Sequence, residues 1–159
     1  MDLWGRLARS GTQPAPGGTM VRARAEAMYA RDLTCQTLGV TLDEVAPGRA
    51  VLGMLVTGDM VNGHGITHGG YVFLLADAAF AYACNSHGPV TVAQAAQVTF
   101  LQPAQVGDRL TAEAVERVRQ GRSGVYDVTV TGPGGVVAEF RGQSVSLAGN
   151  PFPAPTVQE

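Results

Sequence analysis

A carboxylate stands alone in the most apolar segment of the sequence. In "NGHGITHGGYVFLLADAAFAYACN" (residues 62–85), a glycine-rich loop leads into a hydrocarbon run whose one charged residue is Asp77. Placing a charge among apolar side chains is costly unless it has a partner or a chemical task. A poorly hydrated carboxylate can act as a nucleophile or as a general base for water. Asp77 is therefore the first candidate catalytic residue.

The sequence His68-Gly69-Gly70 stands where the apolar run should begin as a helix. The first backbone N–H groups of a helix have no internal partner and lie at the positive end of its dipole. Glycine lets a ligand approach that backbone closely. We expect an oxyanion hole here, with the Gly69 N–H as donor, Asn62 and His68 adding side-chain hydrogen bonds, and Gly70 contacting the substrate.

Other interpretations of these residues remain open. Asp77 could be a structural carboxylate satisfied by a neighbouring backbone group or arginine, which is common for a buried Asp. His64 and His68 could be metal ligands, but they lie in a loop with no third His or Cys beside them, so we expect no metal site. A dinucleotide-binding GxGxxG is not completed, because His68 stands where the third glycine should be.

Three arginines cluster in the second half of this weakly charged chain. Arg117, Arg119 and Arg122 stand on a predicted strand and the turn after it. They could bind the phosphates of a substrate or form a solvated strand edge. We expect them to be substrate-binding residues.

These residues must be positioned by the elements around them. Helix formers predict a short helix over residues 20–34, branched apolar residues predict a strand over 48–57, and the apolar run predicts a long helix. Period-two alternation and β-favouring residues then predict strands in the rest of the chain, at 91–104, 108–120, 123–132 and 135–148. Glycines at 121–124 and 132–135 predict hairpin turns.

This order of elements predicts an α+β fold. The long helix is apolar nearly all round, so it must be enclosed. A curved antiparallel sheet wrapped around it would achieve this. A series of alanines keeps the helix thin enough for close approach: Ala76, Ala78, Ala79, Ala81 and Ala83.

The length of 159 residues fits one domain, which we place at residues 20–148. The linker-like composition of 10–18 suggests that residues 1–19 are a flexible N-terminal segment. The Pro-rich residues 149–159 suggest a loose tail.

Composition narrows the possible partners and compartments. A net charge of −2 gives no attraction to nucleic acid, and a charged fraction of 15% suggests surface buried in an oligomer. The apolar run is too short and too charged to span a membrane, and residues 1–10 lack a signal-peptide core, so we expect no membrane association. Cys35 and Cys84 lie far apart, which predicts reduced thiols and a cytoplasmic protein.

The motif resembles the active-site segment of hotdog-fold acyl-CoA thioesterases of the phenylacetic acid degradation (PaaI) type. Their pattern is an Asn, an HGG six residues later, and an Asp nine residues after the His; Asn62, His68 and Asp77 match it. The resemblance extends more loosely over about residues 20–147. It implies a hotdog fold, in which a sheet of five to six strands wraps a long buried central helix.

The resemblance also implies the chemistry. It predicts hydrolysis of acyl-CoA, with aromatic acyl groups such as hydroxyphenylacetyl preferred. Asp77 then corresponds to the catalytic carboxylate, while Asn62, His68 and the Gly69 N–H polarise the thioester carbonyl. No cofactor is expected, since coenzyme A is part of the substrate.

We also expect the site to be shared between two chains. Gly69 and Asp77 are eight residues apart, or about 12 Å along one helix. Both must lie about 3 Å from the same carbonyl group, which one chain cannot readily achieve. Two antiparallel helices related by a two-fold axis can achieve it. The resemblance implies the same assembly: a homodimer with shared active sites, associating further as a dimer of dimers (a homotetramer).

Two other functions stay open. A hotdog enoyl-thioester hydratase or dehydratase would carry an Asp-x-Asn-Pro-x-His segment, which "DMVNGHGITH" does not complete. A non-catalytic acyl-CoA binding module would not need Asn62, His68 and Asp77 together. An α/β-hydrolase thioesterase is disfavoured because the chain has no GxSxG elbow.

Overall fold

The computed structural model describes residues 16–149; residues 1–15 and residues 150–159 of the predicted tail lie outside it. The chain forms, in order, α1 (Pro16–Tyr29), α2 (Leu33–Thr37), β1 (Thr41–Ala46), β2 (Arg49–Leu55), a 3₁₀ turn (Gly58–Met60), α3 (Gly69–Asn85), β3 (Thr91–Phe100), β4 (Arg109–Gln120), β5 (Ser123–Gly132) and β6 (Gly135–Ser146). This confirms the predicted α+β class, the long helix and the four later strands.

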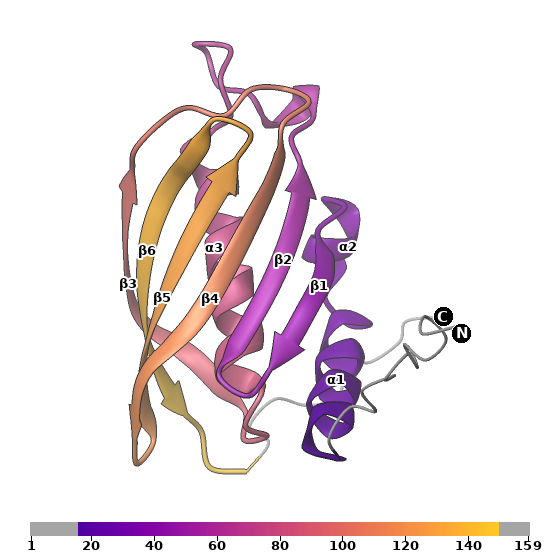
Figure 1. Cartoon of the computed structure of the whole chain (residues 1–159), viewed down its shortest axis with the longest axis vertical. Coiled ribbons are helices and arrows are strands. Elements are labelled where there is room, and N and C mark those ends of the chain that lie inside the picture. Colours follow the sequence, from indigo (N-terminus) through magenta and orange to yellow (C-terminus); the bar gives the residue numbers. More distant parts are fainter. Residues whose placement is uncertain (1–15, 150–159) are drawn as a thin grey trace, which may run out of the picture.

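The strands form one six-stranded sheet in the order β1-β2-β4-β5-β6-β3, and every neighbouring pair is antiparallel. Helix α3 lies along one face of this sheet (Figure 1). The register shifts in four of the strand pairs. Such bulges bend and twist strands, which lets a sheet curve around a helix.

The core lies between α3 and the inner face of the sheet. Phe80 of α3 packs edge-on against Tyr126 of β5, with ring centroids 5.5 Å apart, and contacts Phe140 of β6 at 5.8 Å. A side chain at Gly142 would lie 2.8 Å from the Phe80 ring, so glycine is required there for the sheet to approach. Strand β5 alternates as predicted, with Tyr126, Val128 and Val130 fully buried.

The predicted burial of α3 is confirmed, since no residue from 71 to 85 is exposed, but the two sides of the helix differ in burial in the single chain. Ala76, Ala79 and Ala83 are fully buried against the sheet. Asp77, Ala78 and Ala81, on the side of the helix away from the sheet, are only half-buried. The sheet therefore covers one side of the helix and leaves the side with Asp77 for another surface.

The predicted N-terminal helix over 20–34 is displaced and divided. Helix α1 begins at Pro16, a residue suited to a first helical position, so residues 16–19, which we placed in the N-terminal segment, are helical. It ends at Tyr29 because Asp32 begins a separate short helix, accepting the Cys35 N–H at 3.0 Å as its N-cap. Both helices lie beside β1 at one edge of the sheet (Figure 1).

Both cysteines are buried free thiols, as predicted. Burial raises the pKa of Cys35 and of Cys84 to about 12, so neither is a reactive thiolate at neutral pH. No helix within residues 16–149 has the length and apolarity needed to cross a membrane.

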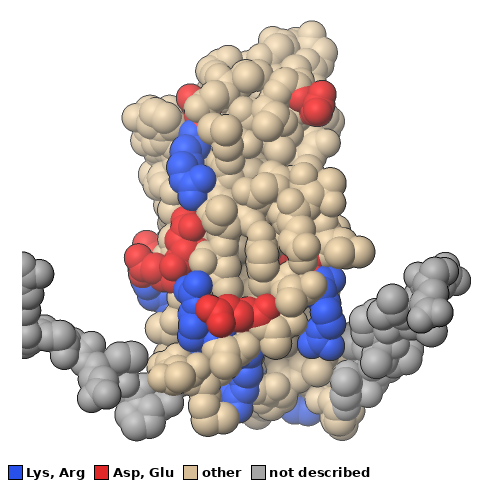
Figure 2. All heavy atoms as spheres, turned by 90° about the vertical axis from the view of Figure 1, so that its right-hand side faces the viewer, with Lys and Arg blue, Asp and Glu red and all other residues tan. Residues whose placement is uncertain are grey.

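Charged side chains are unevenly spread over the β1 side of the molecule. Figure 2 shows them gathered over the middle and lower parts of this face, while the upper end is largely uncharged. The loop before α3 lies at that upper end (Figure 1). The predicted active-site loop thus stands in mostly uncharged surroundings.

Candidate active site

The loop before α3 is held in place by its backbone. The His68 N–H donates to the Met60 carbonyl at 2.7 Å, and the Thr67 N–H and hydroxyl both donate to the Ala104 carbonyl, at 2.9 and 2.8 Å. Val61 and Thr67 form a β-bridge across the loop. These bonds fix the point at which the helix begins.

His68 is the N-cap of α3, so the helix begins at His68-Gly69-Gly70, as predicted. Its ring nitrogen Nδ1 accepts the Gly70 N–H at 3.1 Å, and its carbonyl accepts the Tyr71 N–H at 3.0 Å. In the part of the chain that the structure describes, the Gly69 N–H has no acceptor. It remains a free donor at the positive end of the helix, as an oxyanion hole requires.

The two glycines after His68 are needed for close packing. A side chain at Gly69 would begin 3.0 Å from the Phe100 ring, and one at Gly70 would begin 3.3 Å from His68 Nδ1. Neither glycine has a positive φ. The Phe100 ring and the His68 ring therefore lie against these glycines, while Gly69 also lines a cavity.

Asn62 is oriented by its own loop. Its Oδ1 accepts the His64 N–H at 2.9 Å, and its backbone N–H donates to the Ile66 carbonyl at 2.8 Å. Over residues 16–149, no acceptor is found for the Asn62 Nδ2 group. The amide therefore presents its donor end, which is the end that a carbonyl oxygen would need.

A cavity of about 420 Å³ brings Asn62 and Gly69 together. Most of its other lining residues are apolar: Ile66, Val72, Phe100, Leu101, Pro103, Ala104 and Val137, with Thr67 and Gln102. Phe100 and Leu101 are 52% and 57% exposed. A largely apolar cavity with a few directed donors is typical of a small-molecule site.

Sequence reasoning missed the segment after β3 as part of this cavity. The available signal was a pair of large apolar residues, Phe100 and Leu101, that end a strand just before Pro103. Nothing local in the sequence shows that they meet Gly69, because that contact joins segments about thirty residues apart.

Asp77 lies farther along α3 and does not line this cavity. Burial raises the pKa of its carboxyl above the usual range for Asp. Within the described residues it has neither an ion-pair nor a hydrogen-bond partner, so the structural interpretation, in which an arginine or backbone group satisfies it, finds no support there. The structure thus brings Asn62, His68 and Gly69 together and leaves Asp77 apart, on the uncovered side of α3.

The three predicted substrate-binding arginines point in different directions. Arg117 Nε donates to Asp127 at 2.7 Å, and Arg141 binds the same carboxylate at 2.6 Å. The bonds from Arg141 and then Arg117 hold the pKa of Asp127 below its usual range. Arg119 instead lies near Glu116 and helps to lower the pKa of that carboxyl. Arg122 is exposed in the β4–β5 turn, so the three do not form one cluster.

A second polar cluster lies at the end of α3. Glu116 Oε2 accepts the Tyr126 hydroxyl at 2.7 Å and lies 2.6 Å from His87 Nε2. Burial raises the pKa of Glu116, but the bonds from Tyr126 and His87 outweigh it and hold the pKa below its usual range. Sequence reasoning did not find this cluster, because its members come from three segments: Glu116 from β4, Tyr126 from β5 and His87 from the turn just after α3.

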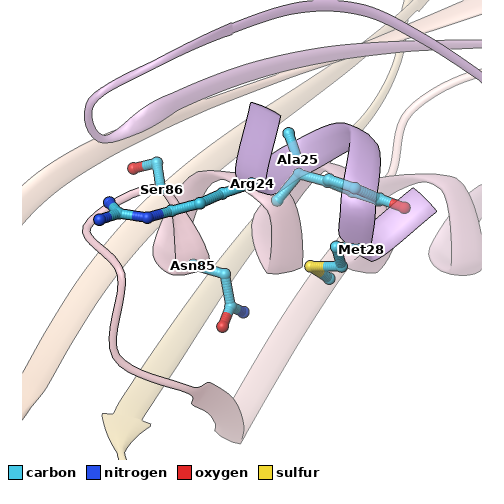
Figure 3. A pocket seen from close by; sticks show the side chains of 6 residues that line it. Arg24, Ala25, Met28, Asn85 and Ser86 are labelled. Atoms are coloured by element: carbon cyan, nitrogen blue, oxygen red, sulfur yellow. The ribbon is translucent and has the colours of Figure 1, made fainter. Parts of the chain in front are cut away.

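The cavity between α1 and α3 is not a substrate site. Figure 3 shows Arg24, Ala25 and Met28 of α1 facing Asn85 and Ser86 at the end of α3. The enclosed volume is about 10 Å³, enough for one water molecule. Elsewhere in residues 16–149, no three His, Cys, Asp or Glu side chains are grouped as a metal site would need.

The sequence of this chain is similar to those of known proteins. Residues 64–139, which include His68 and Asp77, match the family model of the thioesterase superfamily. The chain is 45% identical to the acyl-coenzyme A thioesterase PaaI of Escherichia coli over 126 residues, which is 79% of this chain and 90% of that protein.

Solved structures agree with the sequence comparison. The E. coli PaaI protein from the phenylacetic acid degradation operon superposes with a TM-score of 0.81 at 43% identity, covering 83% of this chain and 96% of that one. A mutant of the phenylacetic acid degradation protein PaaI from Thermus thermophilus gives 0.71 at 38% identity, covering 73% and 100%. The chain therefore belongs to the thioesterase superfamily, with a hotdog fold, and is a thioester hydrolase of the PaaI type.

Proposed function

We propose that the protein hydrolyses acyl-CoA thioesters with aromatic acyl groups of the hydroxyphenylacetyl type. The observation that carries this proposal is a largely apolar cavity lined by both Gly69 and Asn62, whose N–H and Nδ2 groups have no acceptor among the described residues. The E. coli relative is named an acyl-coenzyme A thioesterase, and both solved PaaI structures are named for phenylacetic acid degradation. An aromatic acyl group would suit the apolar lining.

In the proposed reaction, the thioester oxygen accepts hydrogen bonds from Gly69 and Asn62, which stabilise the negative charge that develops there. Asp77 either attacks the carbonyl carbon or removes a proton from the water that attacks it. When water attacks, the carbon–sulfur bond breaks, CoA leaves as thiolate and takes up the proton that Asp77 removed, and the acid is released. When Asp77 attacks, CoA leaves as thiolate and a mixed anhydride remains on Asp77; water then hydrolyses this anhydride, which releases the acid, restores the carboxylate and supplies the proton for CoA. A thioester carbonyl is activated by its weak resonance, so we propose that no metal or cofactor takes part.

We propose that two chains build each site. Asp77 lies about 12 Å along α3 from Gly69, on the side of the helix that its own sheet leaves uncovered. Strand β3 is an edge strand paired only with β6, and five consecutive residues, 93–97, are exposed and uncharged. An exposed edge of this kind is a template for pairing with another strand. Pairing β3 with its copy around a two-fold axis would set the two α3 helices antiparallel.

The proposed dimer also gives a role to Arg122 in the β4–β5 turn. The Ser146 N–H donates to the Arg122 carbonyl at 2.8 Å, and Ser146 pairs with Thr91, so Arg122 lies near the start of β3. The cavity with Phe100 lies at the other end of that strand. Antiparallel pairing would bring the Arg122 turn of one chain near the cavity of the other. We propose that Arg122 and Arg119 bind CoA phosphates there. Arg117 instead keeps its ion pair with Asp127.

We propose a homodimer that associates further as a dimer of dimers, in the cytoplasm, where the free thiols Cys35 and Cys84 would stay reduced. We expect no nucleic-acid or membrane partner.

The test is a panel of aliphatic and aromatic acyl-CoAs, including phenylacetyl-CoA and hydroxyphenylacetyl-CoA, with release of CoA followed by a thiol reagent. We expect the highest kcat/KM with the hydroxylated aromatic substrates. Higher values for aliphatic substrates would overturn the aromatic preference. Binding of acyl-CoA without thiol release would indicate a non-catalytic binding module.

A further inference from the structure

We propose that His68 serves the reaction as a positioning residue, with its Nδ1 atom capping α3 so that the Gly69 N–H is left for the thioester oxygen. This inference rests on the proposed function. It replaces the expectation that the His68 ring itself polarises the carbonyl.

His68 accepts two of the first three backbone N–H groups of α3. The Gly70 N–H donates to His68 Nδ1 and the Tyr71 N–H donates to the His68 carbonyl. The Gly69 N–H comes before both and has no acceptor among the described residues. Without the cap, the Gly70 N–H would compete with the Gly69 N–H for the substrate oxygen, and the first turn could fray.

The capping orientation of the exposed His68 ring rests on its bond from Gly70 and on a fixed backbone. The His68 N–H is bound to the Met60 carbonyl at 2.7 Å, which fixes the backbone of the residue. Its φ and ψ of −62° and 130° are the extended values of an N-cap. The ring lies so close to Gly70 that a side chain there would begin 3.3 Å from Nδ1. Glycine at position 70 is therefore explained by the cap.

The chemistry of the ring follows from this bond. An Nδ1 that accepts a hydrogen bond carries no proton, so the neutral ring carries its proton on Nε2. A cap needs an acceptor at the Nδ1 position. A residue that polarises the carbonyl needs a donor, and Nε2 is the one available. The two roles therefore use different ends of the same ring.

Two substitutions separate these ends. In His68→Asn, the side-chain oxygen stands near the position of Nδ1, and Asn is among the preferred N-cap residues. In His68→Gln, the longer side chain carries an N–H₂ donor toward the position of Nε2 but is a poor cap. His68→Ala removes both functions.

We expect His68→Ala to lower kcat by about 10²-fold, the loss typical of a misplaced reacting group, with a smaller change in KM. His68→Asn should recover most of that loss and remain within about tenfold of wild type, while His68→Gln should stay near the alanine variant. Circular dichroism establishes that each variant is folded. Any other order of the three variants would overturn the proposal.

A measurement on the wild-type protein tests the cap without relying on turnover. In protein labelled with ¹⁵N-histidine, the His68 ring should show an unprotonated Nδ1 and a protonated Nε2 near neutral pH. A proton on Nδ1 would overturn the cap even in an active enzyme. Lack of activity on every acyl-CoA with the expected ring signals would instead count against the proposed function alone.

Discussion

At the scale of single residues, Asp77 carries the strongest prediction. Replacing it with Asn keeps the shape of the side chain but removes the nucleophile or base, so kcat should fall by about 10³-fold or more. The measurement is CoA release by folded Asp77→Asn protein under saturating substrate. Near-normal turnover would show that the reaction does not use this carboxylate.

The same substitution should stabilise the protein at neutral pH. Burial raises the pKa of Asp77 in the folded chain, so the folded state favours the protonated form, and ionisation costs stability as pH rises through that raised pKa. Asn cannot ionise and avoids this cost. Urea unfolding should show Asp77→Asn more stable than wild type at pH 7, with the difference shrinking toward acidic pH. An unchanged or lower stability at pH 7 would contradict the assigned environment.

Asn62 should act as one donor among two. Its Oδ1 is held by the His64 N–H, so its Nδ2 group is directed before substrate arrives. Asn62→Ala should reduce kcat by about 10²-fold, the usual loss for one oxyanion donor, and Asn62→Asp should not restore it because Asp offers no N–H. If only KM rises, Asn62 binds substrate without stabilising the transition state.

At the scale of elements, the junction of α3 and β4 should contribute to stability. The Tyr126 hydroxyl donates to the Glu116 carboxylate, which also contacts His87 at the end of α3. A hydrogen bond to a charged group is worth about 1.5–3 kcal/mol, and partial exposure of Glu116 reduces this. We expect Tyr126→Phe to lower the free energy of unfolding by about 1–2 kcal/mol.

The stability effect of this junction should depend on pH. The pKa of Glu116 is lowered in the folded chain, so its contribution is present above the unfolded pKa and is lost as pH falls through the folded value. The difference between Tyr126→Phe and wild type should therefore shrink in acid. A constant difference from neutral to strongly acidic pH would mean that packing, and not the Glu116 bond, was lost.

The elements also show which parts of the site could be predicted from sequence. The start of α3 at His68-Gly69-Gly70 and the β4–β5 and β5–β6 turns follow from glycine-rich local signals, and in the structure Gly121 and Gly135 have positive φ. The side of the sheet on which each arginine lies does not follow from local signals. Period-two alternation would place Arg117 and Arg119 on one face, but a bulge between Glu116 and Val118 shifts the register. A bulge depends on the partner strand, which local sequence does not reveal.

At the scale of the whole molecule, the single chain presents an incomplete site. Asn62 and Gly69 line the cavity, while Asp77 lies on a side of α3 that the sheet leaves uncovered. The resemblance to a known motif predicted the roles of these residues. It did not bring them together, because Gly69 and Asp77 are too far apart along one helix to reach the same carbonyl group. In the proposed dimer, a second copy of the chain would supply its own Asp77, brought by antiparallel helices beside the first chain's cavity.

Mixing two damaged chains tests this assembly. Asp77→Asn and Asn62→Ala variants, each expected to be nearly inactive, are unfolded together in equal amounts, refolded, and assayed. If each site takes Asn62 from one chain and Asp77 from the other, a mixed dimer has one doubly damaged site and one intact site. Half of the dimers are mixed, so about a quarter of wild-type activity should return. Each variant refolded alone controls for recovery. If both residues of a site came from one chain, no intact site could form, and the mixture would show only the mean of the two variants.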